Sequence, residues 1–170
     1  MARKIAILLE EMYNEYEFWY PYYRFLEAGF QVDVVGTGRM DVYKSKVGLP
    51  ARETVSALNT DAARYEAVII PGGFAPDFMR RDPAMVSLVR DVFNRGGVVA
   101  AICHAGWMLA SAGVLKGKKA TGFFAIKDDL INAGAEYLDQ EVVVDENLIT
   151  SRTPDDLPVF CLAILQKLGA

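Results

Sequence analysis

Histidine and cysteine are scarce in this sequence, which holds one histidine and two cysteines among its 170 residues. A zinc site is usually built from several such side chains, and a disulfide framework requires more than one pair of cysteines. We therefore expect neither a metal nor another cofactor. The chain is long enough to build its own hydrophobic core without cross-links, so a reducing cytoplasm is the expected compartment.

Positive charge and long apolar runs are lacking as well. Lysine and arginine number 18 against 22 aspartates and glutamates, which gives a net charge of −4. A general nucleic-acid-binding protein requires a basic face, so we expect no nucleic acid partner. The first apolar run, Ile5–Leu9, stops at Glu10 and is too short for a signal peptide or a membrane-spanning helix. The sequence therefore predicts a cytoplasmic protein without a membrane partner.

The sequence does contain a regular alternation of strand-like and helix-like segments. Apolar or alternating runs predict strands at residues 4–9, 30–35, 67–70, 98–102, 120–124, 141–144 and 148–150. Helices are predicted at residues 16–28, 83–94, 104–112, 128–133 and 155–168, the last one capped by Thr153. Turn residues between Gly36 and Leu58 favour a small hairpin. The pattern predicts one α/β domain over residues 1–170, a doubly wound and mostly parallel sheet with helices on both faces.

In such a fold the functional groups lie beyond the carboxyl ends of the parallel strands. Three predicted strand ends carry suitable residues: the acidic segment Glu10–Glu17, the pair Gly72-Gly73, and the pair Cys103-His104. The fold is expected to bring these segments to one edge of the sheet.

Cys103 occupies the position of a nucleophile elbow, where a strand stops and a helix begins. Small neighbours at Ala101 and Ala105 suit the tight packing of such a turn. The positive end of the helix dipole is expected to favour the reactive thiolate. The alternative is a cysteine that is simply a small buried hydrophobe, which is our interpretation of Cys161. The neighbouring His104 favours an activated nucleophile, unless it points to solvent or to a subunit contact.

The other candidate residues have simpler interpretations that remain open at this point. Acidic side chains such as Glu10, Glu15 and Glu17 often stand near a helix start as surface partners of the dipole. Gly72 and Gly73 could supply two backbone N–H groups as an oxyanion hole, or could form a simple tight turn. The aromatic residues of the first helix are typical of core or of a subunit interface.

Several motifs recur in a fixed order along almost the whole chain. They are Tyr20-Pro21-Tyr22 with Arg24, Pro71-Gly72-Gly73 with Ala75-Pro76, Ala101-Ile102-Cys103-His104, Ala112-Gly113-Val114-Leu115, Ile126-Lys127-Asp128-Asp129 with Ile131-Asn132-Ala133-Gly134, Glu141-Val142-Val143-Val144-Asp145, and Ser151-Arg152. With these motifs the sequence resembles the ThiJ/PfpI superfamily, most closely its PfpI-type intracellular proteases. The resemblance implies a flavodoxin-like sheet and a homodimer that often assembles into a hexameric ring, with sites at subunit boundaries.

The resemblance also implies roles for individual residues. Cys103 is the implied nucleophile, Glu17 the carboxylate hydrogen-bonded to it, and Gly72 and Gly73 the oxyanion site. His104 would point toward a subunit boundary. In the PfpI-type proteases a glutamate from a neighbouring subunit completes a Cys-His-Glu triad, and here Asp77 stands at that position.

Two further positions depart from the pattern of close relatives. Asn14 replaces an acid, and Phe123 replaces a tyrosine near the thiol, so that a hydroxyl donor is lost.

We therefore keep three functions in view. The leading hypothesis is a PfpI-like cysteine hydrolase acting on peptides. The second is cofactor-independent glyoxalase III or protein deglycase chemistry on small carbonyl compounds, with Cys103 forming a hemithioacetal. The third is a redox-responsive stress protein or chaperone.

Overall fold

A central sheet of seven strands forms the frame of the protein. The structure is a computed structural model and describes residues 3–170. The strand order is β10-β11-β7-β6-β1-β2-β5, and every neighbouring pair is parallel except β10 with β11. The strands are β1 (Lys4–Leu8), β2 (Gln31–Gly36), β5 (Val55–Ser56), β6 (Ala67–Ile70), β7 (Val98–Ile102), β10 (Val143–Asp145) and β11 (Leu148–Ser151).

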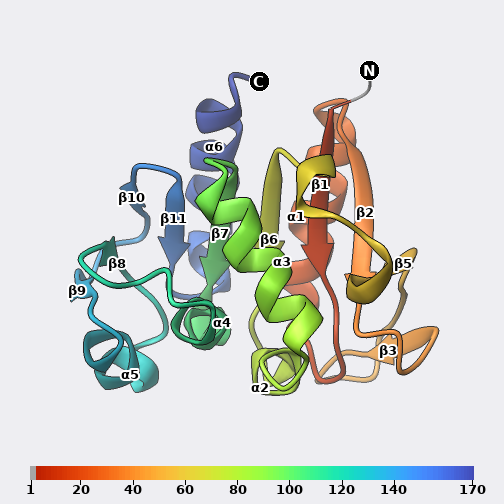
Figure 1. The fold of residues 1–170 in the computed structure, drawn as a ribbon, viewed down its shortest axis with the longest axis horizontal. Coiled ribbons are helices and arrows are strands. Elements are labelled where there is room, and N and C mark those ends of the chain that lie inside the picture. Colours follow the sequence, from red (N-terminus) through yellow and green to blue (C-terminus); the bar gives the residue numbers. More distant parts are fainter. Residues whose placement is uncertain (1–2) are drawn as a thin grey trace.

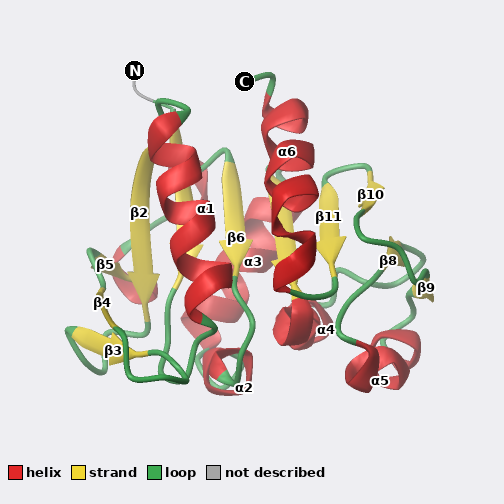
Figure 2. Cartoon of the chain, turned by 180° about the vertical axis from the view of Figure 1, so that it is seen from behind, coloured by secondary structure: helices red, strands yellow, loops and turns green. Residues whose placement is uncertain are grey.

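Helices cover both faces of this sheet. The two helices α1 (Glu15–Glu27) and α6 (Leu157–Leu168) pack side by side on one face (Figure 2). The opposite face carries α3 (Pro83–Asn94) and α4 (Gly106–Ala112) (Figure 1). Two short helices, α2 (Ala75–Met79) and α5 (Lys127–Asn132), lie near the carboxyl ends of the strands. The predicted doubly wound, flavodoxin-like arrangement is confirmed.

The centre of the sheet is apolar on both sides, as its position between two helix layers requires. All residues of β6 and β7 are buried, and the register places Ile7 beside Ile69 and Ile69 beside Ala100. Complete burial of one such isoleucine contributes about 1.5–3 kcal/mol. The rigid centre therefore fixes the positions of the loops that follow β1, β6 and β7.

Two small ribbons lie outside the main sheet. The predicted hairpin between Gly36 and Leu58 is present as β3 (Val42–Lys44) paired antiparallel with β4 (Pro50–Arg52). The second ribbon pairs β8 (Lys119–Ala120) with β9 (Glu136–Tyr137). Within residues 3–170 no helix is long and apolar enough to span a membrane.

Three local predictions are wrong in detail. The strand expected over residues 120–124 ends at Ala120, because the chain turns back and the Phe123 N–H donates to the Cys103 carbonyl oxygen at 3.1 Å. The helix expected from His104 begins at Gly106, after a 3-10 turn over Cys103–Ala105. The last helix begins at Leu157 after another 3-10 turn, so the Thr153 side chain makes no capping hydrogen bond.

Candidate active site

Cys103 lies where β7 ends and the 3-10 turn before α4 begins. Its backbone φ is 62°, a left-handed conformation that residues other than glycine rarely adopt. Such a conformation costs on the order of 1–3 kcal/mol and persists only where the surroundings impose it. The side chain is 8% exposed, so the thiol is largely enclosed but open to one pocket. The predicted strand-to-helix turn at Cys103 is confirmed.

Glu17 reaches the thiol from the first turn of α1. Asn14 caps this helix: its side-chain oxygen accepts the N–H groups of Tyr16 at 3.0 Å and Glu17 at 3.2 Å. Glu17 is completely buried, and its Oε2 atom accepts the Gly72 N–H at 2.7 Å. The same carboxyl lies beside the Cys103 thiol and interacts with it, while its Oε1 atom has no hydrogen-bond partner within the described residues.

Burial determines the protonation of this carboxyl. Loss of solvent raises the pKa of Glu17 to about 8, and the interactions with Gly72 and Cys103 offset only part of that effect. At neutral pH Glu17 is therefore mainly a carboxylic acid. In that form it can donate an O–H to the sulfur, which a carboxylate cannot do.

Burial opposes the low pKa that the place of the thiol before a helix suggested. Burial raises the pKa of Cys103 to about 12, and a negative charge on Glu17 raises it further. The backbone N–H groups of His104 and Gly73 act in the opposite direction, because they donate to the sulfur. Burial thus acts against the helix dipole, and a stabilised thiolate at Cys103 remains a prediction. Since the repulsion from Glu17 disappears when that carboxyl is protonated, the thiolate forms most easily with Glu17 neutral.

His104 is close enough to exchange a proton with the thiol. Its Nδ1 atom lies 3.2 Å from the Cys103 Sγ atom, although the two residues are adjacent in the chain. Burial and the positive charge of Lys46 lower the pKa of His104, so the ring is neutral at neutral pH. The ring packs against Phe123 at 4.8 Å and Trp107 at 5.3 Å between centroids. A neutral imidazole held in this way can accept the thiol proton at Nδ1.

The two glycines at the end of β6 have different roles. The Gly72 N–H is donated to Glu17 in this structure, so its predicted role toward a substrate oxyanion would require that bond to be released. A Cβ atom on Gly72 would lie 2.6 Å from Glu17 Oε2 and 2.9 Å from Cys103 Cβ, and glycine is therefore required for this close approach. The N–H groups directed at the sulfur are those of Gly73 and His104. These two amides are the better candidates for an oxyanion site.

A pocket of about 200 Å³ opens above the thiol. Its lining comes from the loops after β1, β3, β6, β7 and β8 and from the turn before α6. The lining residues are Asn14, Lys46, Gly73, Phe74, Cys103, His104, Phe123, Thr153 and Pro154. The volume suits a small molecule or a single side chain.

Comparison with protein families matches residues 3–167 to the DJ-1/PfpI family. The chain belongs to the DJ-1/PfpI family. Its similarity to Protein/nucleic acid deglycase 2 of Escherichia coli is 42% identity over the full length of both chains. It is 38% identical to YraA of Bacillus subtilis, whose name assigns it provisionally to the cysteine proteases, over 94% of this chain and 95% of that one.

A solved structure shares the fold closely. It is a two-domain protein of Anabaena variabilis with DJ-1/ThiJ/PfpI-like and ferritin-like domains, with a TM-score of 0.96 and 46% identity. The match covers 98% of this chain but 48% of that one, so this chain spans about half the length of that protein. The DJ-1/PfpI relatives thus include proteins named for different activities on one fold.

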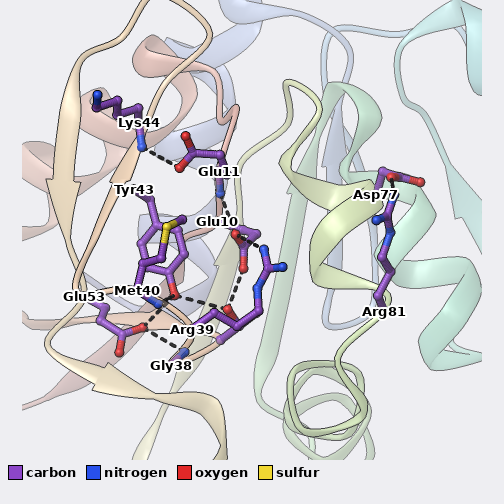
Figure 3. A network of polar contacts seen from close by, with 11 residues as sticks. Glu10, Glu11, Gly38, Arg39, Met40, Tyr43, Lys44, Glu53, Asp77 and Arg81 are labelled. Carbon is purple, nitrogen blue, oxygen red and sulfur yellow. Dashed lines mark hydrogen bonds and ion pairs between the residues drawn. The ribbon is translucent and has the colours of Figure 1, made fainter.

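Among the predicted site residues of this DJ-1/PfpI protein, Asp77 stands apart. The structure brings together Cys103, His104 and Glu17, but Asp77 projects from α2 and forms an ion pair with Arg81 (Figure 3). Within residues 3–170 its carboxylate makes no hydrogen bond to His104. Completion of a triad by Asp77 of a neighbouring subunit remains a prediction.

Lys46 is a charged pocket residue that sequence reasoning missed, as it also missed Phe74 and Pro154. Lys46 follows β3 in the hairpin and lines the pocket beside Cys103 and His104. A lysine in a polar hairpin is typical of solvent-exposed surface, and no local pattern distinguishes one that faces a nucleophile. Only the register of the hairpin against the loop after β1 reveals its position.

Proposed function

We propose that this protein is a cofactor-independent, Cys103-dependent enzyme that converts small 2-oxoaldehydes or their adducts, as in glyoxalase III and deglycase chemistry. The observation that carries the proposal is the pairing of the thiol with a buried carboxyl whose pKa is about 8. A carboxyl that titrates near the working pH can both accept and return a proton, as the isomerisation of a carbonyl compound requires.

The first step is addition of the thiol to the aldehyde carbon. The S–C bond forms while the thiol proton passes to the aldehyde oxygen through His104 Nδ1, which lies 3.2 Å from the sulfur. The product is a hemithioacetal. The N–H groups of Gly73 and His104, already directed at the sulfur, support the negative charge that develops on the oxygen during addition.

The second step moves hydrogen between the two carbons. In its ionised form Glu17 removes the proton from the sulfur-bearing carbon, which comes within reach because the carboxyl already lies beside the thiol. The proton returns to the neighbouring carbonyl carbon, and the hydroxyl proton passes to the second oxygen. The result is a thioester of a 2-hydroxy acid. Water cleaves it and restores the thiol, so that methylglyoxal plus one water gives lactate.

Peptide hydrolysis is the second candidate, supported by the paired amides of Gly73 and His104 and by the relative named for cysteine proteases. It ranks below carbonyl chemistry for three reasons. Asp77 is held by Arg81, Phe123 supplies no hydroxyl, and the pocket above the thiol is about 200 Å³.

The deciding experiment offers the purified protein methylglyoxal, a fluorogenic peptide and an aggregating client protein. Each assay is run beside the Cys103→Ala variant. Lactate formed by the parent protein alone supports the proposal. Cysteine-dependent peptide cleavage without lactate would select the hydrolase, and client protection that survives Cys103→Ala without either reaction would select a chaperone.

A further inference from the structure

We propose that Lys46 makes the Cys103 pocket selective for carbonyl compounds that carry a carboxylate or a phosphate. Lys46 is then the specificity-determining residue of the site. The inference rests on the proposed function for the identity of the reacting group. The preference for negative charge follows separately from the pocket lining. It can be tested through alkylation of the Cys103 thiol, without any carbonyl substrate.

Lys46 brings an unneutralised positive charge to the pocket. Its ammonium group lies 5.7 Å from the centroid of the Phe74 ring, which also lines the pocket. Within residues 3–170 this ammonium has no ion pair and no hydrogen bond. Its charge reaches the reacting groups, since it lowers the pKa of both Glu17 and His104. A ligand in the pocket therefore meets an ammonium group that is not paired with a carboxylate of the protein.

The backbone around Lys46 is held in place by the loop after β1. The Lys46 N–H donates to the Tyr13 carbonyl oxygen at 3.0 Å, and the Met12 N–H donates to the Lys44 carbonyl oxygen at 2.8 Å. The Lys44 N–H in turn donates to the Glu11 carboxylate at 2.9 Å (Figure 3). These bonds fix the hairpin beside Asn14 and so place Lys46 at the pocket.

A second set of contacts anchors the base of the same hairpin. Glu10 is completely buried just after β1, and its carboxylate accepts a hydrogen bond from the Thr37 hydroxyl at 2.5 Å. It also accepts one from Arg39 at 2.8 Å (Figure 3). The Tyr43 hydroxyl joins Thr37 to Glu53. These contacts hold the start of the hairpin that carries Lys46 to the end of β1.

The remaining polar side chains of the pocket also favour an anion. The Asn14 side-chain oxygen is occupied in capping α1, which leaves its NH₂ group as the available donor. The Thr153 hydroxyl makes no capping bond and can donate. Glu15 does not line the pocket, and Glu17, which lies behind the thiol, is mainly uncharged at neutral pH.

The direct test uses two alkylating reagents of nearly the same shape and different charge. Iodoacetate is an anion and iodoacetamide is neutral, and both react with a thiolate. Any change in the thiol pKa affects both rates equally, so the ratio of the two rates at pH 7 reports the charge of the pocket. Cys161 is 1% exposed, and peptide mapping restricts the measurement to Cys103.

Lys46→Met is expected to lower the ratio of the iodoacetate rate to the iodoacetamide rate about 5- to 10-fold, because it removes one positive charge from the pocket lining. Lys44→Met is the matched control, because it removes the same charge from the same hairpin but does not line the pocket. Its ratio is expected to change less than 2-fold. Asn14→Asp keeps a good helix cap and is expected to lower the ratio by adding a negative charge to the pocket lining. Equal ratios in the two lysine variants would overturn the proposal.

Turnover provides the second arm. Methylglyoxal is compared with hydroxypyruvaldehyde phosphate, a 2-oxoaldehyde that carries a phosphate. Lys46→Met is expected to raise KM at least 10-fold for the phosphorylated aldehyde and less than 2-fold for methylglyoxal. Equal increases for both aldehydes would contradict the role of Lys46. If neither aldehyde is converted by the parent protein, the proposed function fails, and the alkylation ratio still decides whether the pocket selects anions.

Discussion

At Glu17, the energetic cost of burying a carboxyl makes protein stability depend on pH. The pKa of about 8 in the folded protein lies above the value of 4.5 for a free side chain. Between these values the folded state holds a proton that the unfolded state has released. Stability therefore falls as pH rises from about 4.5 to about 8 and levels off above that pH.

The first prediction follows from this difference. Glu17→Gln removes the titrating group and keeps an NH₂ donor toward the sulfur. The parent protein is expected to lose stability relative to Glu17→Gln by on the order of 4 kcal/mol between pH 5 and pH 8. Urea unfolding at several pH values measures this difference. A constant difference over that range would show that Glu17 is ionised in the folded protein.

Gly72 is the residue on which the geometry of the site depends most directly. A methyl group there would lie 2.6 Å from Glu17 Oε2 and 2.9 Å from Cys103 Cβ. Gly72→Ala is therefore expected to displace the carboxyl from the thiol and to reduce turnover about 100-fold or more, since misplacement of reacting groups by about 1 Å has such effects. The readout is kcat together with circular dichroism. A folded variant with full activity would mean that the Glu17 carboxyl and the Cys103 thiol can move apart without loss of turnover.

At the scale of elements, the network around Glu10 is expected to hold the hairpin to the sheet. Arg39→Met leaves the buried Glu10 carboxylate without its cationic partner, and we expect a loss of about 1–3 kcal/mol. Arg52→Met is the control: the Arg52–Asp41 pair is 4.0 Å long and largely exposed. Its removal should cost less than about 0.5 kcal/mol. Denaturant unfolding of both variants checks the difference, and similar losses would show that the Glu10 network does not anchor the hairpin.

Elements with a strong local pattern could be predicted from the sequence. The helix expected over residues 83–94 is α3, and the strand expected over residues 98–102 is β7, because Pro83 and the apolar run fix their bounds locally. The segment at 120–124 could not be predicted, since a hydrogen bond to the Cys103 carbonyl, far away in sequence, decides its path.

The same distinction holds for the candidate site. The position of Cys103 follows from a strand that runs directly into a helix, and its proximity to Glu17 followed from the family resemblance. The pKa of the thiol and the engagement of the Gly72 N–H depend on the packing of α1 against the ends of β6 and β7. Local sequence contains no signal for either property, and Lys46 was missed for the same reason.

At the scale of the whole molecule, the predicted homodimer or hexamer remains a proposal. The outer face of α1 exposes Tyr16, Tyr20 and Tyr23, with 64%, 42% and 61% of their surfaces accessible. Aromatic side chains gathered on one exposed helix face are typical of an interaction surface.

The prediction at this scale concerns Asp77. If its carboxylate orients His104 of a neighbouring subunit, Asp77→Asn should lower the kcat of the Cys103-dependent reaction about 100-fold in the assembled protein. Arg81→Met is the matched control, because it breaks the same ion pair and keeps the carboxylate. It should leave kcat nearly unchanged, with sedimentation confirming the same assembly for both variants. Equal losses in the two variants would assign the effect to the Asp77–Arg81 pair.

The hydrogen bond from Gly72 to Glu17 has a consequence for spectroscopy. This amide proton points into a fully buried carboxyl beneath the thiol, so it can exchange with deuterium only when α1 and the end of β6 separate. Its exchange lifetime therefore measures how often the site opens. Its chemical shift should also change as Glu17 gains or loses its proton. A single backbone resonance thus reports both the integrity and the protonation of the site in the resting protein, without any substrate present.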